Sequence, residues 1–353
     1  MTKVSGHIKP LDGLRALAVA GVLVHHFGTP RLELGTYGVI LFFVLSGFLI
    51  TGILLRVKTQ VAAGTITLWR ALRLFYARRF LRIFPIYYLT LAVLFACNIP
   101  GARAHIGWHV LYATNIWVAI HQHFEKATGQ FWSLAVEEQF YLIWPIFILL
   151  IPIKWLRTVA ISLAAVGVSF RFFGNLVFHL SPITTNPLLP GCLDSLSLGA
   201  LLAINQRKDA LWLRRFGWVA SLLVVAEVAL ELIDKGTVLR RDTLVLFCVL
   251  SAAAVVDHAA SRTNGRIGRM LSWKALTPIG TISYGIYLYH MPVHVLSGMS
   301  GIKTVVLTLL VAALSWHLIE KPINSLKSRF PYPVSPHEPD KQHSGLSNSA
   351  LAT

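Results

Sequence analysis

Residues 11–28 read LDGLRALAVAGVLVHHFG, an apolar stretch that is long enough to cross a bilayer but holds an arginine near its start and two histidines at its end. The 353-residue chain is 55% hydrophobic and 13% charged, whereas about a quarter of the residues of a soluble domain are charged. We therefore predict an all-α, polytopic membrane protein whose first transmembrane helix is this stretch. The absence of a small-residue cleavage site after it argues against a signal peptide.

Apolar runs of spanning length, roughly 17–25 residues, occur ten times. They lie near 11–29, 37–55, 83–99, 132–153, 158–178, 188–205, 216–233, 243–260, 276–297 and 302–319. With the N-terminus inside, 24 lysines and arginines fall in the cytoplasmic segments and 7 in the outer ones, as cytoplasmic loops require. Both termini are therefore expected in the cytoplasm, and the formal net charge of +17 needs no nucleic-acid partner.

The segment 105–124, HIGWHVLYATNIWVAIHQHF, offers an eleventh crossing as an alternative. That crossing would leave 15 basic residues inside and 16 outside, so the bias would vanish. We therefore predict an interfacial or re-entrant helix on the outer side. Residues 1–329 are expected to form one transmembrane domain, and the polar, Pro/Ser-rich residues 330–353 are expected to be a disordered cytoplasmic tail.

Arg15 and His26 share one face of the first helix, because eleven residues make three turns plus about 20° and place the pair about 16 Å apart along the axis. His25 lies about 80° from that face. Ionisable groups inside a span are costly and are candidate functional residues, and an imidazole can take a proton from a hydroxyl at neutral pH. The alternative is a packing or hydrogen-bonding histidine.

Arg82 precedes the third predicted span and Pro85, where its guanidinium can bind a phosphate or carboxylate at the cytoplasmic mouth. Arg70, Arg73, Arg78 and Arg79 nearby are expected to face lipid headgroups or water.

Polar residues also interrupt three later spans. Ser133 and Glu137 are one turn apart in FWSLAVEEQFYLIWP, and Glu137 is placed to orient a histidine or bind a sugar hydroxyl. Asp194 in PGCLDSLSLGALLA and His290, beside Tyr287 in SYGIYLYHMPV, fit a buried hydrogen-bonding role as well as a catalytic one. The histidines at 105, 109, 121 and 123 match no metalloenzyme motif, so no metal is predicted.

Seven motifs in order resemble the acyltransferase 3 family of integral membrane O-acyltransferases, over roughly residues 8–325. They are LDGLRALAVAGVLVHHFG, GVILFFVLSGFLIT, RRFLRIFPIYYL, FWSLAVEEQFYLIWP, CLDSLSLGALLA, SYGIYLYHMPV and HLIEKPIN. The resemblance implies an O-acetyltransferase in the cell (inner) membrane that moves an acyl group, often acetyl from acetyl-CoA, to a sugar hydroxyl. The acceptor would be a cell-surface polysaccharide such as lipopolysaccharide O-antigen, a lipid-linked oligosaccharide or a glycosylated small molecule.

The family has a basic residue followed, after ten residues, by an essential histidine. The resemblance assigns these two positions to Arg15 and His26. It also implies donor contacts for Arg82 and a functional carboxylate at Glu137. On this reading Arg15 and Arg82 bind acyl-CoA, and His26 is either the general base or a transient acyl carrier. His25, where the family often has an aromatic residue, is the other candidate base. The expected acceptor-binding residues are Glu137, Asp194, His290 and Tyr287.

Some family members carry an additional soluble hydrolase-like domain. This chain ends shortly after the tenth predicted span, so we expect it to act alone or with a separate soluble acyl-transfer partner. The alternative functions are a transporter of solutes or lipid-linked sugars and a membrane scaffold. We see neither the internal repeats nor the broken helix pairs of many transporters, and a scaffold leaves the aligned Arg15 and His26 unexplained.

Overall fold

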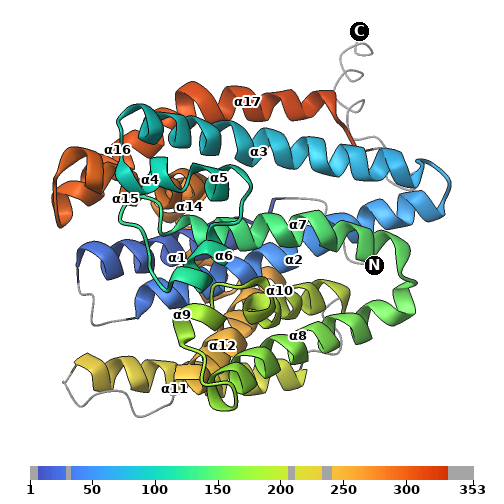
Figure 1. Ribbon diagram of the computed structural model, residues 1–353. Coiled ribbons are helices and arrows are strands. Elements are labelled where there is room, and N and C mark those ends of the chain that lie inside the picture. The colour runs from blue at the N-terminus through green and yellow to red at the C-terminus, as the bar shows by residue number, and fades with distance from the viewer. Residues whose placement is uncertain (1–6, 29–32, 206–210, 233–240, 333–353) are drawn as a thin grey trace, which may run out of the picture.

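The structure, a computed structural model, describes residues 7–28, 33–205, 211–232 and 241–332 (Figure 1). Within these ranges all regular structure is helical. The longer helices are α1 (Lys9–Phe27), α2 (Leu34–Ala62), α3 (Leu68–Ala96), α7 (Phe131–Leu150), α8 (Ile153–Leu176), α10 (Leu189–Ile204), α11 (Leu211–Leu232), α12 (Arg241–Ser261), α15 (Ser283–Ser297) and α16 (Ile302–Ser315). The shorter ones are α4 (Pro100–Ala104), α5 (Ile106–Val110), α6 (Thr114–His121), α9 (Pro182–Thr185), α13 (Arg266–Leu271), α14 (Leu276–Thr281), the π-helix η1 (Trp316–Glu320), α17 (Lys321–Ser325) and the 3-10 helix η2 (Leu326–Arg329).

Every predicted apolar run coincides with one helix or with consecutive helices. In the described part of the chain, six helical stretches are long and apolar enough to cross a membrane: Leu34–Ala62, Leu68–Ala96, Phe131–Leu150, Ile153–Leu176, Asp242–Ser261 and Ile302–Arg329. The helix Leu189–Ile204 is apolar but shorter. The chain is therefore a multi-pass membrane protein, while the number of ten crossings stays a prediction.

The third helix begins well before its predicted start near residue 83. The Thr67 side chain accepts a hydrogen bond from the Arg70 backbone N–H at 3.3 Å, so the helix starts at Leu68 and includes the arginine-rich segment. Arg78 lies inside this helix and donates to the carbonyls of Lys327 and Phe330, at 2.9 Å each. These two carbonyls lie in and directly after η2, and the expected contact of Arg78 with lipid headgroups or water stays a prediction.

Residues 105–124 do not form one helix. They contain two short helices, α5 and α6, joined and followed by turns. The longest, α6, has eight residues, about 12 Å at 1.5 Å per residue, which is too short to cross a bilayer. Tyr112 and Gln122 adopt positive φ values of 50° and 52° and end the helices. Tyr87 of α3 donates to the His109 carbonyl at 2.9 Å and holds this segment against the bundle.

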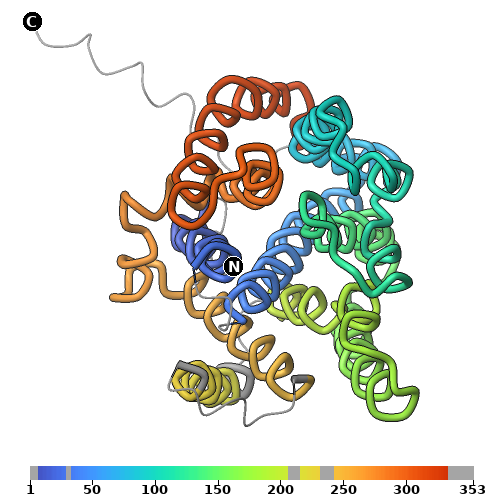
Figure 2. The backbone as a smooth tube through the Cα atoms, turned by 60° about the vertical axis from the view of Figure 1, so that its left-hand side comes forward, coloured from blue at the N-terminus to red at the C-terminus, as the bar shows by residue number. Residues whose placement is uncertain are grey.

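Helices α1 and α2 lie at the centre of the bundle, with the remaining helices around them (Figure 2). Helices α2 and α10 touch through their backbones: a Cβ at Gly47 would overlap the Leu196 carbonyl oxygen, and one at Gly199 would overlap that of Val44. Small residues allow membrane helices this close approach. Helix α11 packs on α12 at the edge of the bundle.

The ninth predicted span is two helices, since α14 ends at Thr281 and α15 begins at Ser283. The positions of both termini and almost all of the predicted disordered tail concern residues 1–6 and 333–353, which lie outside the described ranges.

Candidate active site

A cavity of about 90 Å³ lies inside the bundle and is lined from α1, α2, α3, α7 and α15. Its charged lining residues are Arg15, Arg79, Arg82 and Glu137, and we call it the arginine cavity. Its polar uncharged lining residues are Ser46, Ser133, Tyr141, Ser283, Tyr284 and Tyr287. Four residues singled out from the sequence, Arg15, Arg82, Glu137 and Tyr287, therefore meet at one site although they come from four helices.

The arginine cavity carries an excess of positive charge, since three guanidinium groups face one carboxylate. Arg15 is already paired with Asp12 of the same helix, at 3.3 Å from Nη1 to Oδ1. Arg79 lies over the Tyr141 ring, 5.0 Å from its centroid. Within the described ranges neither Arg79 nor Arg82 forms a hydrogen bond or an ion pair. Two guanidinium groups are therefore available to an anionic ligand.

Glu137 has its own hydrogen-bonding partner in the cavity wall. Ser46 of α2 donates from Oγ to Glu137 Oε1 at 2.5 Å, and the Tyr141 hydroxyl donates to Ser46 Oγ at 2.9 Å. This chain of hydroxyls holds the carboxylate toward α2 rather than in an ion pair with the arginines. Glu137 and Arg82 line the same cavity, so a residue expected to bind the acceptor and a residue expected to bind the donor face one space.

Tyr287 connects the arginine cavity to a buried histidine. Its hydroxyl lies 2.6 Å from Ser133 Oγ, and its carbonyl lies 2.7 Å from Nδ1 of His290. Because a carbonyl can only accept, Nδ1 must donate, and Nε2 of the neutral ring carries the lone pair. His290 is completely buried, and its Nε2 has no partner among the described residues.

His26 lies beside His290 at the end of α1, with 5.0 Å between the ring centroids. Its side chain is exposed and does not line the arginine cavity. His25 packs against the start of α2, where a Cβ on Gly35 would be only 2.9 Å from the His25 ring. The two histidines therefore differ in their surroundings. His26 is accessible and lies next to the imidazole of His290, whereas the ring of His25 packs between α1 and α2.

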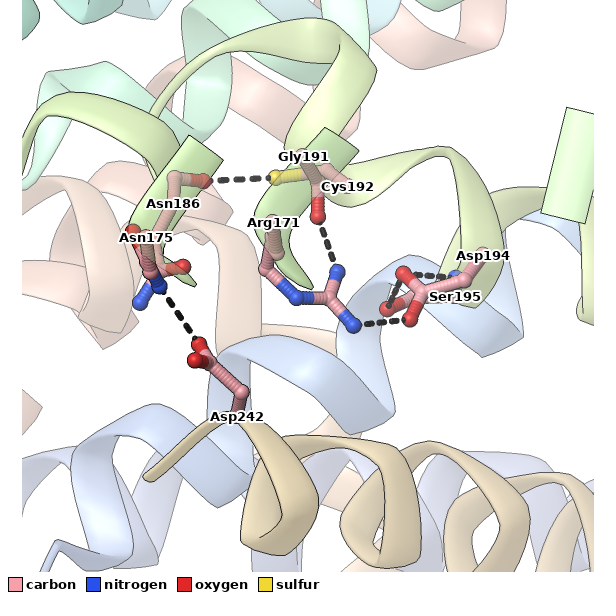
Figure 3. A network of polar contacts seen from close by, with 8 residues as sticks. All are labelled: Arg171, Asn175, Asn186, Gly191, Cys192, Asp194, Ser195 and Asp242. Atoms are coloured by element: carbon pink, nitrogen blue, oxygen red, sulfur yellow. Dashed lines mark hydrogen bonds and ion pairs between the residues drawn. The ribbon is translucent and has the colours of Figure 1, made fainter. Parts of the chain in front are cut away.

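Asp194 lies apart from the arginine cavity. Its carboxylate pairs with Arg171 of α8 at 2.5 Å, and each side chain is 3% exposed (Figure 3). It also accepts from the Ser195 backbone N–H at 2.7 Å, and Arg171 donates to the Gly191 carbonyl. The predicted acceptor contact of Asp194 stays a prediction, and the described structure gives this carboxylate partners of its own.

Sequence reasoning missed Arg79, Ser46 and Tyr141. Arg79 was assigned to the lipid-facing or water-facing arginines, but it is three residues from Arg82 and shares its helix face, a spacing that links the two. Tyr141 is one turn after Glu137, and this spacing likewise places the two side chains on one helix face. Ser46 is a single small polar residue in an apolar helix, and no spacing marked it.

The histidines of the 105–124 segment have local partners. His105 lies 3.4 Å from a Glu125 carboxylate oxygen, and the rings of His105 and His121 pack on Trp117 with centroids 4.3 and 4.7 Å away. Burial, and to a lesser extent His105, lowers the pKa of His109 to about 4, so this ring is neutral. In the part of the chain that the structure describes, no group of three or more potential ligands is arranged for a metal.

Membrane-length helices around a buried, positively charged cavity define a multi-pass membrane protein with an internal polar site. The chain belongs to the acyltransferase 3 family, because the family model described as an acyltransferase domain matches residues 8–319. This membership confirms the resemblance drawn from the seven ordered motifs.

The chain is similar to the peptidoglycan O-acetyltransferase OatA of Listeria monocytogenes, with 30% identity over 90% of this chain and 56% of that protein. It is 31% identical to the putative peptidoglycan O-acetyltransferase YrhL of Bacillus subtilis, over 90% of this chain and 55% of that protein. The O-acetyltransferase OatA of Staphylococcus aureus is 27% identical over 90% of this chain and 57% of its own length. The chain thus spans about half the length of these relatives. No solved structure matches it.

Proposed function

We propose that the protein is an O-acetyltransferase that moves an acetyl group from acetyl-CoA to a sugar hydroxyl of a cell-surface glycan. The observation that carries this proposal is the arginine cavity. Arg79 and Arg82 have no anionic partner in the described ranges and lie beside Arg15. A cavity that holds three guanidinium groups and one carboxylate favours a ligand that brings negative charge, such as a phosphate.

The donor fits the length of α1. Arg15 and His26 are about 16 Å apart along the helix axis. The phosphates of acetyl-CoA would bind the three arginines, and the extended pantetheine arm would reach along α1 to bring the thioester to His26. Donor and acceptor would thus approach from opposite ends of the bundle, with the donor entering from the cytoplasm.

The acyl transfer itself needs a base and a leaving group. The sugar oxygen attacks the thioester carbonyl carbon while the hydroxyl proton passes to an imidazole. The carbon–sulfur bond then breaks, and CoA leaves as a thiol after the imidazolium returns that proton to the sulfur. His26 is the accessible imidazole, and His290 beside it presents the lone pair of Nε2. Transient transfer of the acetyl group to His26 before attack by the sugar is the second route.

The orientation follows from the basic residues. We infer that the bundle crosses the inner (cell) membrane ten times with both termini in the cytoplasm, so that the arginine-rich start of α3 faces the donor. The names of the relatives make peptidoglycan the first acceptor to test, ahead of O-antigen and smaller glycosides. A separate soluble protein that completes the transfer outside the membrane remains part of the proposal.

The experiment is an acetyl-transfer assay with the purified chain in lipid nanodiscs, labelled acetyl-CoA and peptidoglycan fragments. We expect release of CoA together with labelled sugar ester, and a loss of about 10²- to 10⁴-fold in His26→Ala. The matched control is His25→Phe, which retains a ring against Gly35. Near-normal activity in His26→Ala, or sugar movement across the membrane without consumption of acetyl-CoA, contradicts the proposal.

A further inference from the structure

His26 and His290 meet where α1 packs on α15. The centroids of their rings are 5.0 Å apart, and the ring planes are tilted by 42°. At this separation the edges of the two rings are in contact. His26 is exposed, whereas His290 is completely buried, so the pair joins an accessible imidazole to one that is enclosed by the bundle.

The ring of His290 is held in one orientation. Its Nδ1 donates to the Tyr287 carbonyl at 2.7 Å, and the Phe27 ring packs against it with 6.1 Å between the centroids. Tyr287 is itself fixed, because its hydroxyl lies 2.6 Å from Ser133 Oγ on α7. A neutral imidazole whose proton is on Nδ1 has a lone pair on Nε2. The Nε2 atom of His290 can therefore only accept a hydrogen bond.

The rings that contact His290 indicate which group can donate to it. They are the rings of His26, Phe27 and Tyr287. Phe27 has no polar group, and the Tyr287 hydroxyl lies against Ser133. His26 has an N–H, and its ring forms no hydrogen bond in the described ranges. His290 Nε2 is also without a partner among the described residues, and a buried acceptor in that state costs free energy.

We propose that His290 is a positioning residue for His26, with its Nε2 accepting the N–H of the His26 ring when the substrates are bound. This inference rests on the function proposed for His26. Hydrogen bonds between catalytic groups are often long in a ligand-free structure and tighten in the complex with substrate. Because the rings are already in contact, a rotation of the exposed His26 side chain closes the gap.

This hydrogen bond determines which nitrogen of His26 does the chemistry. A neutral histidine that donates through one ring nitrogen has its lone pair on the other. That second nitrogen takes the hydroxyl proton or the acetyl group. When His26 takes the proton, the imidazolium still donates to His290, and the proton then passes to the sulfur of CoA. His290 thus orients the base, as the third member of a catalytic triad does, but as a neutral acceptor.

Two other histidines lie near the pair and serve as comparisons. His294, one turn after His290 on α15, donates from Nδ1 to the Met299 carbonyl at 2.6 Å, and its ring packs on Phe27. His25 lies 5.1 Å from His26 between ring centroids and packs against the start of α2. If His25 instead orients His26, its substitution will have the effect that we expect for His290.

The test measures the reactivity of the His26 ring toward diethyl pyrocarbonate, which acylates the unprotonated nitrogen of an imidazole and needs no acetyl-CoA. The full chain in nanodiscs is treated, and modified histidines are quantified by mass spectrometry with fragmentation. His290→Asn and His290→Gln are matched variants, since the Gln amide reaches the position of Nε2 and the shorter Asn amide only that of Nδ1. We expect the rate at His26 to fall about two- to tenfold in His290→Asn and to be kept in His290→Gln.

The controls are His294→Gln on the same helix and His25→Phe at the other neighbouring ring. Both should leave the rate at His26 at the wild-type value, and the thermal midpoint verifies the fold of every variant. His290→Met fills the buried space with an apolar side chain and replaces His290→Asn if that variant does not fold. An unchanged rate in His290→Asn, an equal loss in His290→Gln, or a loss in His25→Phe alone overturns the proposal.

Failure of this role and failure of the proposed function are distinguishable. In acetyl transfer, His290→Asn should lower kcat about 10- to 100-fold without changing the Kd of acetyl-CoA. If acetyl transfer proceeds in His290→Asn with the wild-type kcat, the function stands and the positioning role is wrong. If the reactivity of His26 depends on His290 but no acetyl group moves from acetyl-CoA to a sugar, the histidine pair stands and the function is wrong.

Discussion

Substituting Arg82 separates donor binding from folding. In the described structure Arg82 has no hydrogen-bonding or ion-pair partner and lies among like charges in the arginine cavity. Arg82→Gln therefore leaves no carboxylate unpaired and removes repulsion with Arg15 and Arg79, so stability should be kept. A hydrogen bond between charged groups contributes about 1.5–3 kcal/mol, so the loss predicts a Kd for acetyl-CoA that is about 10- to 150-fold higher.

The assay is calorimetric titration of acetyl-CoA into the protein in nanodiscs, with the thermal midpoint measured in parallel. Arg82→Lys keeps the charge but loses the two-pronged geometry, so its Kd should lie between those of the wild type and Arg82→Gln. Arg73→Gln is the matched control, because Arg73 is exposed on the same helix. A Kd for Arg82→Gln within about twofold of the wild type, or an equal loss in Arg73→Gln, refutes the assignment.

Substitutions at Ser46 and Gly47 test the wall of the arginine cavity and the packing of α2 on α10. Ser46→Ala removes the hydroxyl that donates to the cavity carboxylate, and kcat for acetyl transfer should fall about tenfold with little change in the Kd of acetyl-CoA; an unchanged kcat would mean that this hydrogen bond positions nothing. Gly47→Ala should abolish recovery of folded protein, measured by fluorescence-detected size exclusion, since a Cβ there overlaps the α10 backbone. Gly52→Ala on the same helix has open space and should be as stable as the wild type or more so by up to about 1 kcal/mol; equal recovery of the two variants would contradict the packing.

The sequence predicted the helical class and the position of most helices, because long apolar runs are a strong signal. The sequence-based prediction of the start of α3 was wrong. An arginine-rich segment is typical of a cytoplasmic loop, and the sequence does not show which groups its arginines contact. Arg78 finds backbone carbonyls about 250 residues later in the chain, a contact that no local pattern contains.

The site was predictable where polar residues stood out in apolar helices. Arg15, Arg82, Glu137 and Tyr287 were identified this way, and the structure places them around one cavity. Asp194 has the same local signal, but its pairing with Arg171 depends on how α8 packs on α10. Spacing within one helix can show which residues share a face, whereas the partner across the bundle is set by tertiary packing.

Donor binding in the arginine cavity can be observed directly in a cryo-electron microscopy structure of the full chain with a non-hydrolysable acetyl-CoA analogue. We expect phosphate density within hydrogen-bonding distance of Arg79 and Arg82, with the pantetheine arm running along α1 and the thioester position beside His26. Density for the analogue outside the arginine cavity, or a thioester position remote from both His26 and His290, would contradict it.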